Sequence, residues 1–383
     1  MALRPMQLKP LSRGVRGRVV IFCVVAAFLG VLGCRGFFVP QCQEYNNCTS
    51  GTTTGTTTGT TTGTTTGTTS TTGITPSSSN GSFVYVANAD AGTVGTFSVA
   101  AGNVSSIAQS TVNAPASPSA IAGAPGGKFL YLATSDGAVY LDTIESNGNL
   151  QAGNNGNPVA HVTQPTWMSM DRAGRWLFVA SSAAGDVQEF QIDAATGALH
   201  PVSQSPALDT GKPTEVYMAA NNQELFAALG KGGVDAFPFD PSTGAVGPRQ
   251  HIAPLHSPSA DNVLTSDSAS RTLYVSEANT GIRAFSIGSG ATLQEISGSP
   301  FGSTLNVPTS MMVQVSSGDL VAANSAASAI TQYSIAADGA LAVVSRSSTS
   351  ADNSPAALIP GKNGNVLSIS KDAVPKVAHL PSQ

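Results

Sequence analysis

The chain has 383 residues, of which only 10% are charged and 6% aromatic, and it contains 40 glycines. From residue 83 onward, 12 Lys and Arg residues stand against 21 Asp and Glu residues. This part is acidic and has no basic stripe that could follow a phosphate backbone, so we expect no nucleic-acid partner. Long amphipathic helical patterns are also missing, and the length suits a single all-β barrel or propeller domain.

The N-terminus predicts export. Residues 1–18 contain five basic residues and no acidic one, and an apolar run from Val19 to Cys34 follows. This pattern indicates a signal peptide over residues 1–33, because the apolar run is short for a membrane span. The run ends in "VLGC", which resembles the signal box of bacterial lipoproteins. The resemblance implies that Cys34 carries a lipid and holds the mature protein at the cell envelope: the outer membrane, the periplasm or the cell surface. An ordinary signal peptide or an uncleaved anchor is the alternative.

Two segments separate the signal peptide from the apolar part of the chain. Residues 34–50 would follow the lipid, and they contain Cys42 and Cys48, which an oxidising compartment would allow to pair. The segment has no His, so a metal site there is disfavoured. Residues 51–82 consist mainly of Thr, Gly and Ser and have almost nothing apolar to bury, which predicts a flexible spacer of on the order of 25 Å.

An internal repeat dominates the rest of the chain. Seven similar segments recur at spacings of 46 to 48 residues, and they read "FVYVAN" from Phe83, "FLYLAT" from Phe129, "WLFVAS" from Trp176, "ELFAAL" from Glu224, "TLYVSE" from Thr272, "DLVAAN" from Asp319 and "NVLSIS" from Asn365. Such regularity indicates a repeat architecture.

Each repeat contains signals for four short strands. A proline followed by a small residue stands about a dozen residues before six of the segments, a second alternating run follows them, and then comes a glycine-containing turn. Four antiparallel strands in each of seven repeats predict an all-β fold, a seven-bladed β-propeller over residues 83–383. The way the ring closes is left open: either residues 376–380 serve the first blade, or that blade is short.

The repeated patterns "YVANADAGTVGTFSV" and "LFVASSAAGDVQEFQIDAATGALHPV" resemble the YVTN-type propellers, from residue 83 to about residue 380. That family includes surface-layer repeat proteins and the propeller-type 6-phosphogluconolactonases. The resemblance implies the fold strongly and lactone hydrolysis weakly. Lactonase-like members place His or Arg after the blade-leading proline, whereas five of the six equivalent residues here are Ser or Thr and one is Ala.

Lactone hydrolysis needs a base that activates water and a group that stabilises the oxyanion. Glu215 and Lys212 are the candidate catalytic pair, and a plain salt bridge or solvated charges are the alternative. The candidate ligand-binding residues at the same face are His256, Glu277, Lys231 and Lys371. Glu277 is the nearest match to the Asn-Glu pair of the lactonase-like members, with Ser276 in place of the Asn.

These observations favour a lipid-anchored, monomeric propeller that binds a protein, a glycan or a small molecule at its channel mouth without catalysis. No metal-ligand spacing, nucleophile elbow or phosphate loop occurs, so we expect neither a metal nor a cofactor. A lactone hydrolase and a passive surface-layer protein are the two alternatives.

Overall fold

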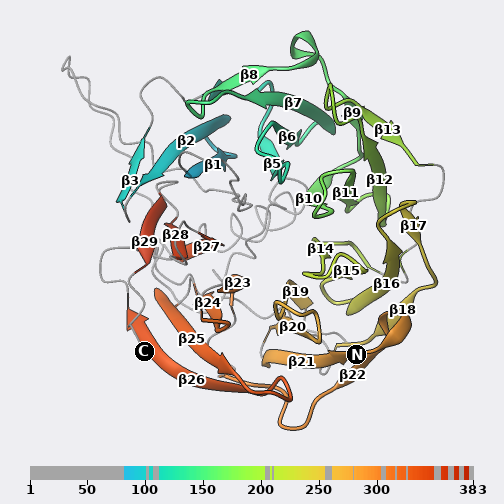
Figure 1. The fold of residues 1–383 in the computed structure, drawn as a ribbon, viewed down its shortest axis with the longest axis vertical. Helices are drawn as coiled ribbons and strands as arrows, with labels where there is room; N and C mark the ends of the chain where they lie inside the picture. The colour runs from blue at the N-terminus through green and yellow to red at the C-terminus, as the bar shows by residue number, and fades with distance from the viewer. Residues whose placement is uncertain are drawn as a thin grey trace, which may run out of the picture. The chain divides into compact units, whose positions relative to one another are not determined.

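A computed structural model describes residues 82–100, 103–106, 112–202, 208, 211–254, 261–278, 280–302, 308–314, 317–324, 327–348, 355–360, 366–370 and 375–378. They belong to one compact unit, Gly55–Gln383. Their strands form seven antiparallel sheets placed around a common centre (Figure 1). The seven-bladed β-propeller predicted from the repeats is therefore confirmed. The predicted signal peptide, Cys34, Cys42, Cys48 and nearly all of the spacer lie outside the described residues.

The sheets are numbered as blades one to seven in chain order, and their strands fall into four positions from the centre outward. The inner strands are β5 (Pro118–Gly123), β10 (Pro165–Met170), β14 (Glu215–Met218), β19 (Asp261–Ser266), β23 (Ser310–Val313) and β27 (Pro355–Pro360). The central strands are β1 (Ser82–Asn88), β6 (Phe129–Thr134), β11 (Trp176–Ser181), β15 (Glu224–Ala228), β20 (Thr272–Glu277), β24 (Leu320–Asn324) and β28 (Val366–Ser370).

Two further positions complete the blades. The third strands are β2 (Thr93–Ala100), β7 (Ala138–Ile144), β12 (Asp186–Ile192), β16 (Val234–Asp240), β21 (Gly281–Ile287), β25 (Ala329–Ile335) and β29 (Pro375–Ala378). The outer strands are β3 (Asn103–Ser106), β4 (Val112–Asn113), β8 (Leu150–Ala152), β9 (Ala160–His161), β13 (Leu199–Pro201), β17 (Ala245–Val246), β18 (Gln250–Ile252), β22 (Leu293–Glu295) and β26 (Leu341–Ser348). Two short 3₁₀ turns, η2 (Asn154–Gly156) and η3 (Ser289–Ala291), lie beside outer strands.

The seven repeated segments are the seven central strands, and the packing explains their composition. In β11, Leu177 and Val179 pack toward blade two, while Phe178 and Ala180 pack toward blade four. Successive side chains of a strand point to opposite faces, so a strand with a blade on each side must be apolar at every position. Every residue of β6, β11 and β20 is accordingly buried.

The outer strand differs from the single weak strand that the sequence predicts. In blades one, two and four it is split: β3, β8 and β17 pair with the end of the third strand, whereas β4, β9 and β18 pair with its beginning. Blade six keeps one continuous outer strand, β26, with a register shift opposite Gln332 and Tyr333. An outer strand is paired on one edge only and buries little apolar surface, so an interruption there costs little stability.

Neighbouring blades are also joined by hydrogen bonds from the central strands to the glycine turns. The hydroxyls of Tyr85, Tyr131 and Tyr274 donate to the carbonyls of Gly148, Gly197 and Gly339 in the next blade, at 2.8 to 3.0 Å. Blade three uses a different residue for this contact: Trp176 Nε1 donates to the Pro241 carbonyl of blade four at 3.1 Å. The predicted glycine turns are therefore contact points between blades as well as reversals of the chain.

Ring closure joins blade seven to blade one through apolar packing. Val84 and Val86 of β1 pack with Ile359 and Leu367 of blade seven. β29 pairs with β28 inside blade seven, so the suggestion that residues from 376 onward serve blade one is wrong for Lys376–Ala378. Within the described ranges, no strand lies on the inner side of β1.

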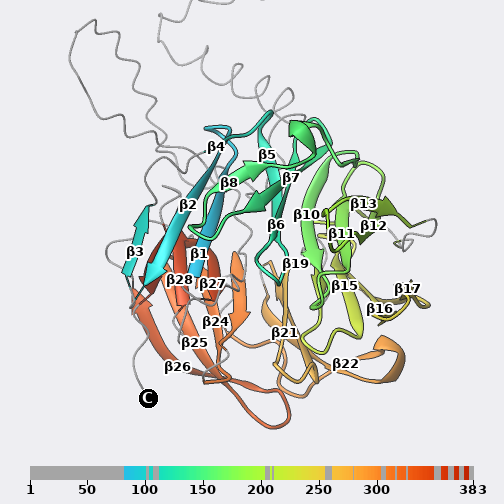
Figure 2. The same cartoon turned by 45° about the horizontal axis from the view of Figure 1, so that its top comes forward.

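Strand direction gives the ring two distinct faces, and Figure 2 shows the long strands running between them. We call the face where the inner strands begin, at or just after their leading prolines, the proline face. The central strands end on this face and the third strands begin on it. The turns between these two strands therefore lie beside the leading prolines, as in residues 229–233 of blade four.

We expect Gly244→Ala to destabilise the fold more than Gly156→Ala does. The two glycines have nearly the same left-handed conformation, with φ of 78° and 77°. A Cβ on Gly244 would lie 2.5 Å from the Trp176 ring of blade three, whereas a Cβ on Gly156 would meet nothing within 4 Å. Both variants should lose about 1 kcal/mol through backbone strain, and Gly244→Ala at least about 1 kcal/mol more through the clash. Urea unfolding would measure the difference, and equal losses would contradict a blade contact at this turn.

Glu189 should make the stability fall as the pH rises through the acid range. It lies on β12 opposite Phe178, its exposed fraction is 1%, and burial raises its pKa to about 7. The unfolded chain loses this proton near pH 4.5 and the folded chain near pH 7, so the free energy of unfolding decreases between those values. Glu189→Gln should remove this decrease and add roughly 1–3 kcal/mol at pH 8.

The exposed Glu145 provides the matched control for this substitution. Glu145→Gln should leave the pH dependence of the unfolding free energy unchanged. If the unfolding midpoint of Glu189→Gln changed with pH in the same way as that of the wild type, Glu189 would not be the cause of the decrease in stability.

Candidate functional site

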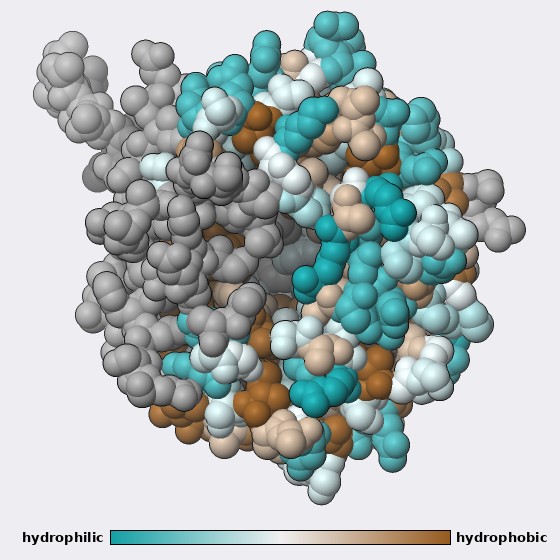
Figure 3. Space-filling model, viewed as in Figure 1, coloured by the Kyte–Doolittle hydropathy of each residue, from teal (hydrophilic) through white to brown (hydrophobic). Residues whose placement is uncertain are grey.

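The strand topology brings the predicted site residues of the described part to the proline face. Lys212 lies just before β14, Glu215 begins β14, Lys231 lies in the turn between β15 and β16, and Glu277 ends β20. His256 and Lys371 lie outside the described residues. Figure 3 shows a hollow at the centre of the ring, with hydrophilic residues on the described part of its rim.

Glu215 is withdrawn from solvent. Its exposed fraction is 3%, and one carboxylate oxygen, Oε2, accepts the backbone N–H of Leu264 in blade five at 3.3 Å. Burial raises the pKa of this carboxyl well above its usual range, and the bond from Leu264 offsets part of the rise. The environment therefore favours the protonated acid.

Lys212 is exposed, and among the described residues no ion pair joins it to Glu215. The two side chains thus share a face of blade four but occupy different environments: one lies in solvent and the other in the contact between two blades. A catalytic role for the pair stays a prediction.

Two of the hydroxyls after the leading prolines join neighbouring blades. Thr166 Oγ1 donates to the Pro213 carbonyl of blade four at 2.8 Å, and Thr309 Oγ1 donates to the Pro355 carbonyl of blade seven at 3.3 Å. The resemblance to lactonase-like propellers places His or Arg at these positions. Here the two hydroxyls donate to backbone carbonyls of the next blade, which is a structural role.

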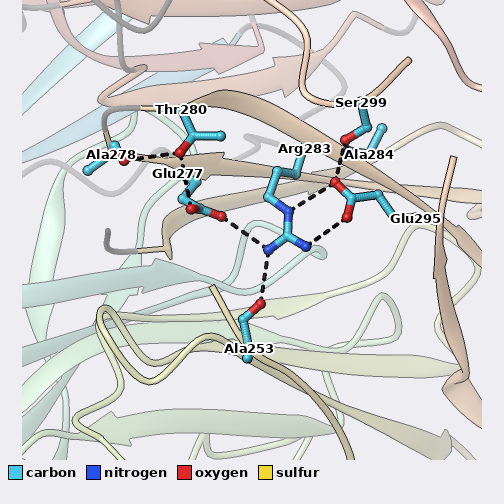
Figure 4. Close-up of polar contacts among 8 residues, drawn as sticks. All are labelled: Ala253, Glu277, Ala278, Thr280, Arg283, Ala284, Glu295 and Ser299. Carbon is cyan, nitrogen blue, oxygen red and sulfur yellow. Dashed lines mark hydrogen bonds and ion pairs between the residues drawn. The ribbon is translucent and has the colours of Figure 1, made fainter. Parts of the chain in front are cut away.

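Glu277 belongs to a buried network centred on Arg283 of β21 (Figure 4). Arg283 Nη1 contacts Glu277 Oε2 at 3.1 Å, and its Nε and Nη2 donate to both carboxylate oxygens of Glu295 at 3.1 and 2.9 Å. Arg283 Nη1 also donates to the Ala253 carbonyl of blade four at 3.0 Å.

Hydroxyls complete the same network. Thr280 Oγ1 donates to Glu277 Oε1 at 3.1 Å, and Ser299 Oγ donates to Glu295 Oε1 at 2.7 Å. The bonds from Arg283 and Ser299 hold the pKa of Glu295 below its usual value despite partial burial. Glu277, with an exposed fraction of 0%, therefore balances a buried arginine charge and helps to attach blade five to blade four.

The structure also pairs two residues that sequence reasoning did not connect. His251 Nδ1 lies 2.7 Å from Oδ1 of the buried Asp235, and the His251 side chain is 28% exposed. The two residues are cross-strand partners on β18 and β16. Their register depends on the split of the outer strand, so no spacing rule in the sequence could have identified the pair.

The described residues contain neither a candidate metal cluster nor a candidate membrane-spanning helix. No group of three or more His, Cys, Asp or Glu side chains there is placed to hold a metal ion. No helix in those residues is both long enough and apolar enough to cross a membrane.

We expect Arg283→Met to destabilise the protein by about 3–5 kcal/mol, because it would leave Glu277 buried without its cation. The control is Arg271→Met: Arg271 is 70% exposed and pairs with Asp267 at 3.2 Å. That variant should lose less than about 1 kcal/mol. Thermal or urea unfolding would measure both, and a small loss for Arg283→Met would contradict the network's structural role.

Comparison with solved structures supports the fold alone. A periplasmic gluconolactonase from Pseudomonas aeruginosa matches with a TM-score of 0.58 and 15% identity, over 72% of this chain and 84% of that chain. Hydrazine synthase from Kuenenia stuttgartiensis matches with a TM-score of 0.61 and 14% identity, over 81% of this chain and 95% of that chain. A protein from Lactobacillus plantarum matches with a TM-score of 0.60 and 14% identity, over 72% and 83%.

Sequence comparison identifies the family. No curated protein sequence matches the chain. The family model described as "Lactonase, 7-bladed beta-propeller" matches residues 134–253 and residues 230–357. These overlapping matches cover blades two to seven in part and span more than half of the chain. The chain therefore belongs to the lactonase family of seven-bladed β-propellers.

Proposed function

We propose that this chain is a binding propeller without hydrolytic activity, exported and held at the cell envelope by a lipid on Cys34. The basic N-terminus, the apolar run and the "VLGC" box support export and lipid attachment. The fold match to a periplasmic protein of Pseudomonas aeruginosa is consistent with export. The Thr- and Gly-rich residues 51–82 would act as the spacer between the anchor and the ring.

Catalysis is disfavoured mainly because the two predicted carboxylates of the proline face, Glu215 and Glu277, are buried. Glu215 accepts a backbone N–H at a blade contact, and Glu277 balances Arg283. A general base must reach the water that it activates, and neither carboxylate is accessible for that. The threonines after the leading prolines are engaged with backbone carbonyls in the same way.

The ring would instead act as a rigid support for its loops. The described turns of the proline face combine exposed polar residues, such as Asp90, Asp136 and Lys231, with backbone held by the buried central strands. Function in propellers is carried by loops on a rigid scaffold. We expect a monomer that binds a protein, a glycan or a small molecule there without a cofactor.

A lactone hydrolase is the second candidate, and two observations favour it. The family model carries the lactonase name, and one solved structure of similar fold is a gluconolactonase. Asp235 and His251 also form a carboxylate–imidazole pair at 2.7 Å, an arrangement in which a carboxylate orients a histidine base.

We expect the purified protein to hydrolyse gluconolactone and related sugar lactones no faster than buffer does, as measured in a pH-stat. Lys212→Gln, Glu215→Gln and His251→Gln should then be indistinguishable from the wild type. Gln at residue 215 can still accept the Leu264 N–H, so this variant tests chemistry while keeping the fold. Wild-type turnover that any of these substitutions abolishes would overturn the non-catalytic proposal.

Labelled palmitate should be incorporated by the wild type and by Cys23→Ser but not by Cys34→Ser, because Cys23 lies within the predicted signal peptide. Labelling would be followed on the protein expressed in a bacterial host. A wild type that takes up no label, or a Cys34→Ser variant that keeps it, would contradict lipid attachment at this residue.

A further inference from the structure

We propose that two lysines on touching loops of blade four, Lys212 and Lys231, form a binding site for an anionic group, a phosphate or a carboxylate, on the ligand of the proline face. This inference rests on the proposed binding function and specifies the chemistry of its ligand. It assigns Lys212 to recognition rather than to catalysis.

The loops that carry the two lysines touch each other. A Cβ placed on Gly211 would lie 2.9 Å from the Leu229 carbonyl oxygen and 3.4 Å from the Gly232 Cα. The segment that carries Lys212 therefore lies directly against the 229–233 turn that carries Lys231, and both lysines are exposed. Two ammonium groups on loops that touch can approach one anion together.

The turn that carries Lys231 is rich in glycine. Residues 230, 232 and 233 of the turn are all glycine, and Gly230 and Gly233 have left-handed φ values of 57° and 91°. The turn is closed by its own bonds, from the Gly232 N–H to the Leu229 carbonyl and from the Gly233 N–H to the Gly230 carbonyl. A Cβ on Gly233 would clash with the Ile252 carbonyl oxygen, so the glycines allow the turn to pack closely and hold the backbone of Lys231 in place.

Three acids of the proline face are engaged away from the two lysines. Glu215 lies in a blade contact where burial favours its neutral form, Asp235 pairs with His251, and Glu277 pairs with Arg283. Among the described residues, no ion pair joins an acid to Lys212 or Lys231. The two like charges therefore repel each other unless an anion lies between them.

One acid of blade three, Asp186, lies at the start of β12, directly after the turn between β11 and β12. Its preceding residue, Gly185, would place a Cβ 3.6 Å from the Gly211 carbonyl oxygen, so this turn borders the lysine loops. Burial raises the pKa of Asp186, which reduces its negative charge in the acid range. Asp186 therefore marks the edge of the proposed anion site toward blade three.

Exposed charges are distributed unevenly around the proline face. Blades one and two carry exposed Asp90 and Asp136 in the turns that correspond to residues 229–233. A hydrogen bond from the Thr134 hydroxyl lowers the pKa of Asp136, which keeps it ionised. Lys212 and Lys231, the cations that the structure describes as exposed in the loops and turns of this face, both belong to blade four, away from these acids, and this separation orients an anionic ligand toward blade four.

The test is titration calorimetry of the full-length protein with inorganic phosphate, citrate and glucose. Phosphate and citrate should bind and glucose should not, with binding that weakens as the salt concentration rises. The double variant Lys212→Gln/Lys231→Gln should lower the affinity for phosphate and citrate at least about tenfold. Binding of phosphate alone or of citrate alone would identify which of the two groups the ligand carries.

The matched control is Arg172→Gln, which removes an exposed cation from the turn between β10 and β11 on the opposite face. It should keep the wild-type affinities, and circular dichroism should show that both variants are folded. Unchanged anion binding in the folded double variant, or no binding by the wild type, would overturn the lysine site. The lactone assay is independent: wild-type turnover would refute the non-catalytic function whichever way the anions bind.

Discussion

The contact between neighbouring blades is the constraint on which the rest of the structure depends. A central strand such as β11 is apolar on both faces because Leu177 packs toward blade two and Phe178 toward blade four. No single blade could bury both faces by itself, so the blades are stable only as a closed set. Polar groups that enter these contacts must find partners there, because an unsatisfied buried group would cost about 1–3 kcal/mol.

This requirement also explains the chemistry of the proline face. Among the described residues, the inner strands of adjacent blades belong to separate sheets, and side chains bond to backbone across the blade boundary. Thr166 donates to the Pro213 carbonyl, and Glu215 accepts the Leu264 N–H. Arg283 similarly reaches the Ala253 carbonyl across a blade boundary while two carboxylates balance its charge. Glu215 and Glu277, which the sequence suggests as site residues, thus help to assemble the ring. The accessible charges of the proline face, such as Lys231, lie in its loops and turns.

Much of the fold was predictable because the repeat records packing that every blade shares. The seven central strands have counterparts in the structure, as do the leading prolines and the glycine turns that lie within the described residues. The split outer strands were not predictable, since an edge that buries little surface leaves only a weak pattern in the sequence. The pairing of Asp235 with His251 was missed for the same reason, because it depends on the register of β18 with β16.

The sequence by itself determined the architecture and the face on which Lys212, Glu215, Lys231 and Glu277 gather, since strand alternation and repeat spacing are local properties. Only the tertiary structure decided which of these side chains are accessible. Glu215 begins a strand and Glu277 ends one, as many exposed residues also do. Nothing in the local sequence distinguishes these buried carboxylates from exposed ones. Glu215 is buried against the backbone of the next blade, where Leu264 lies 49 residues away in the sequence. Glu277 is buried against Arg283, which lies on the adjacent strand of its own blade.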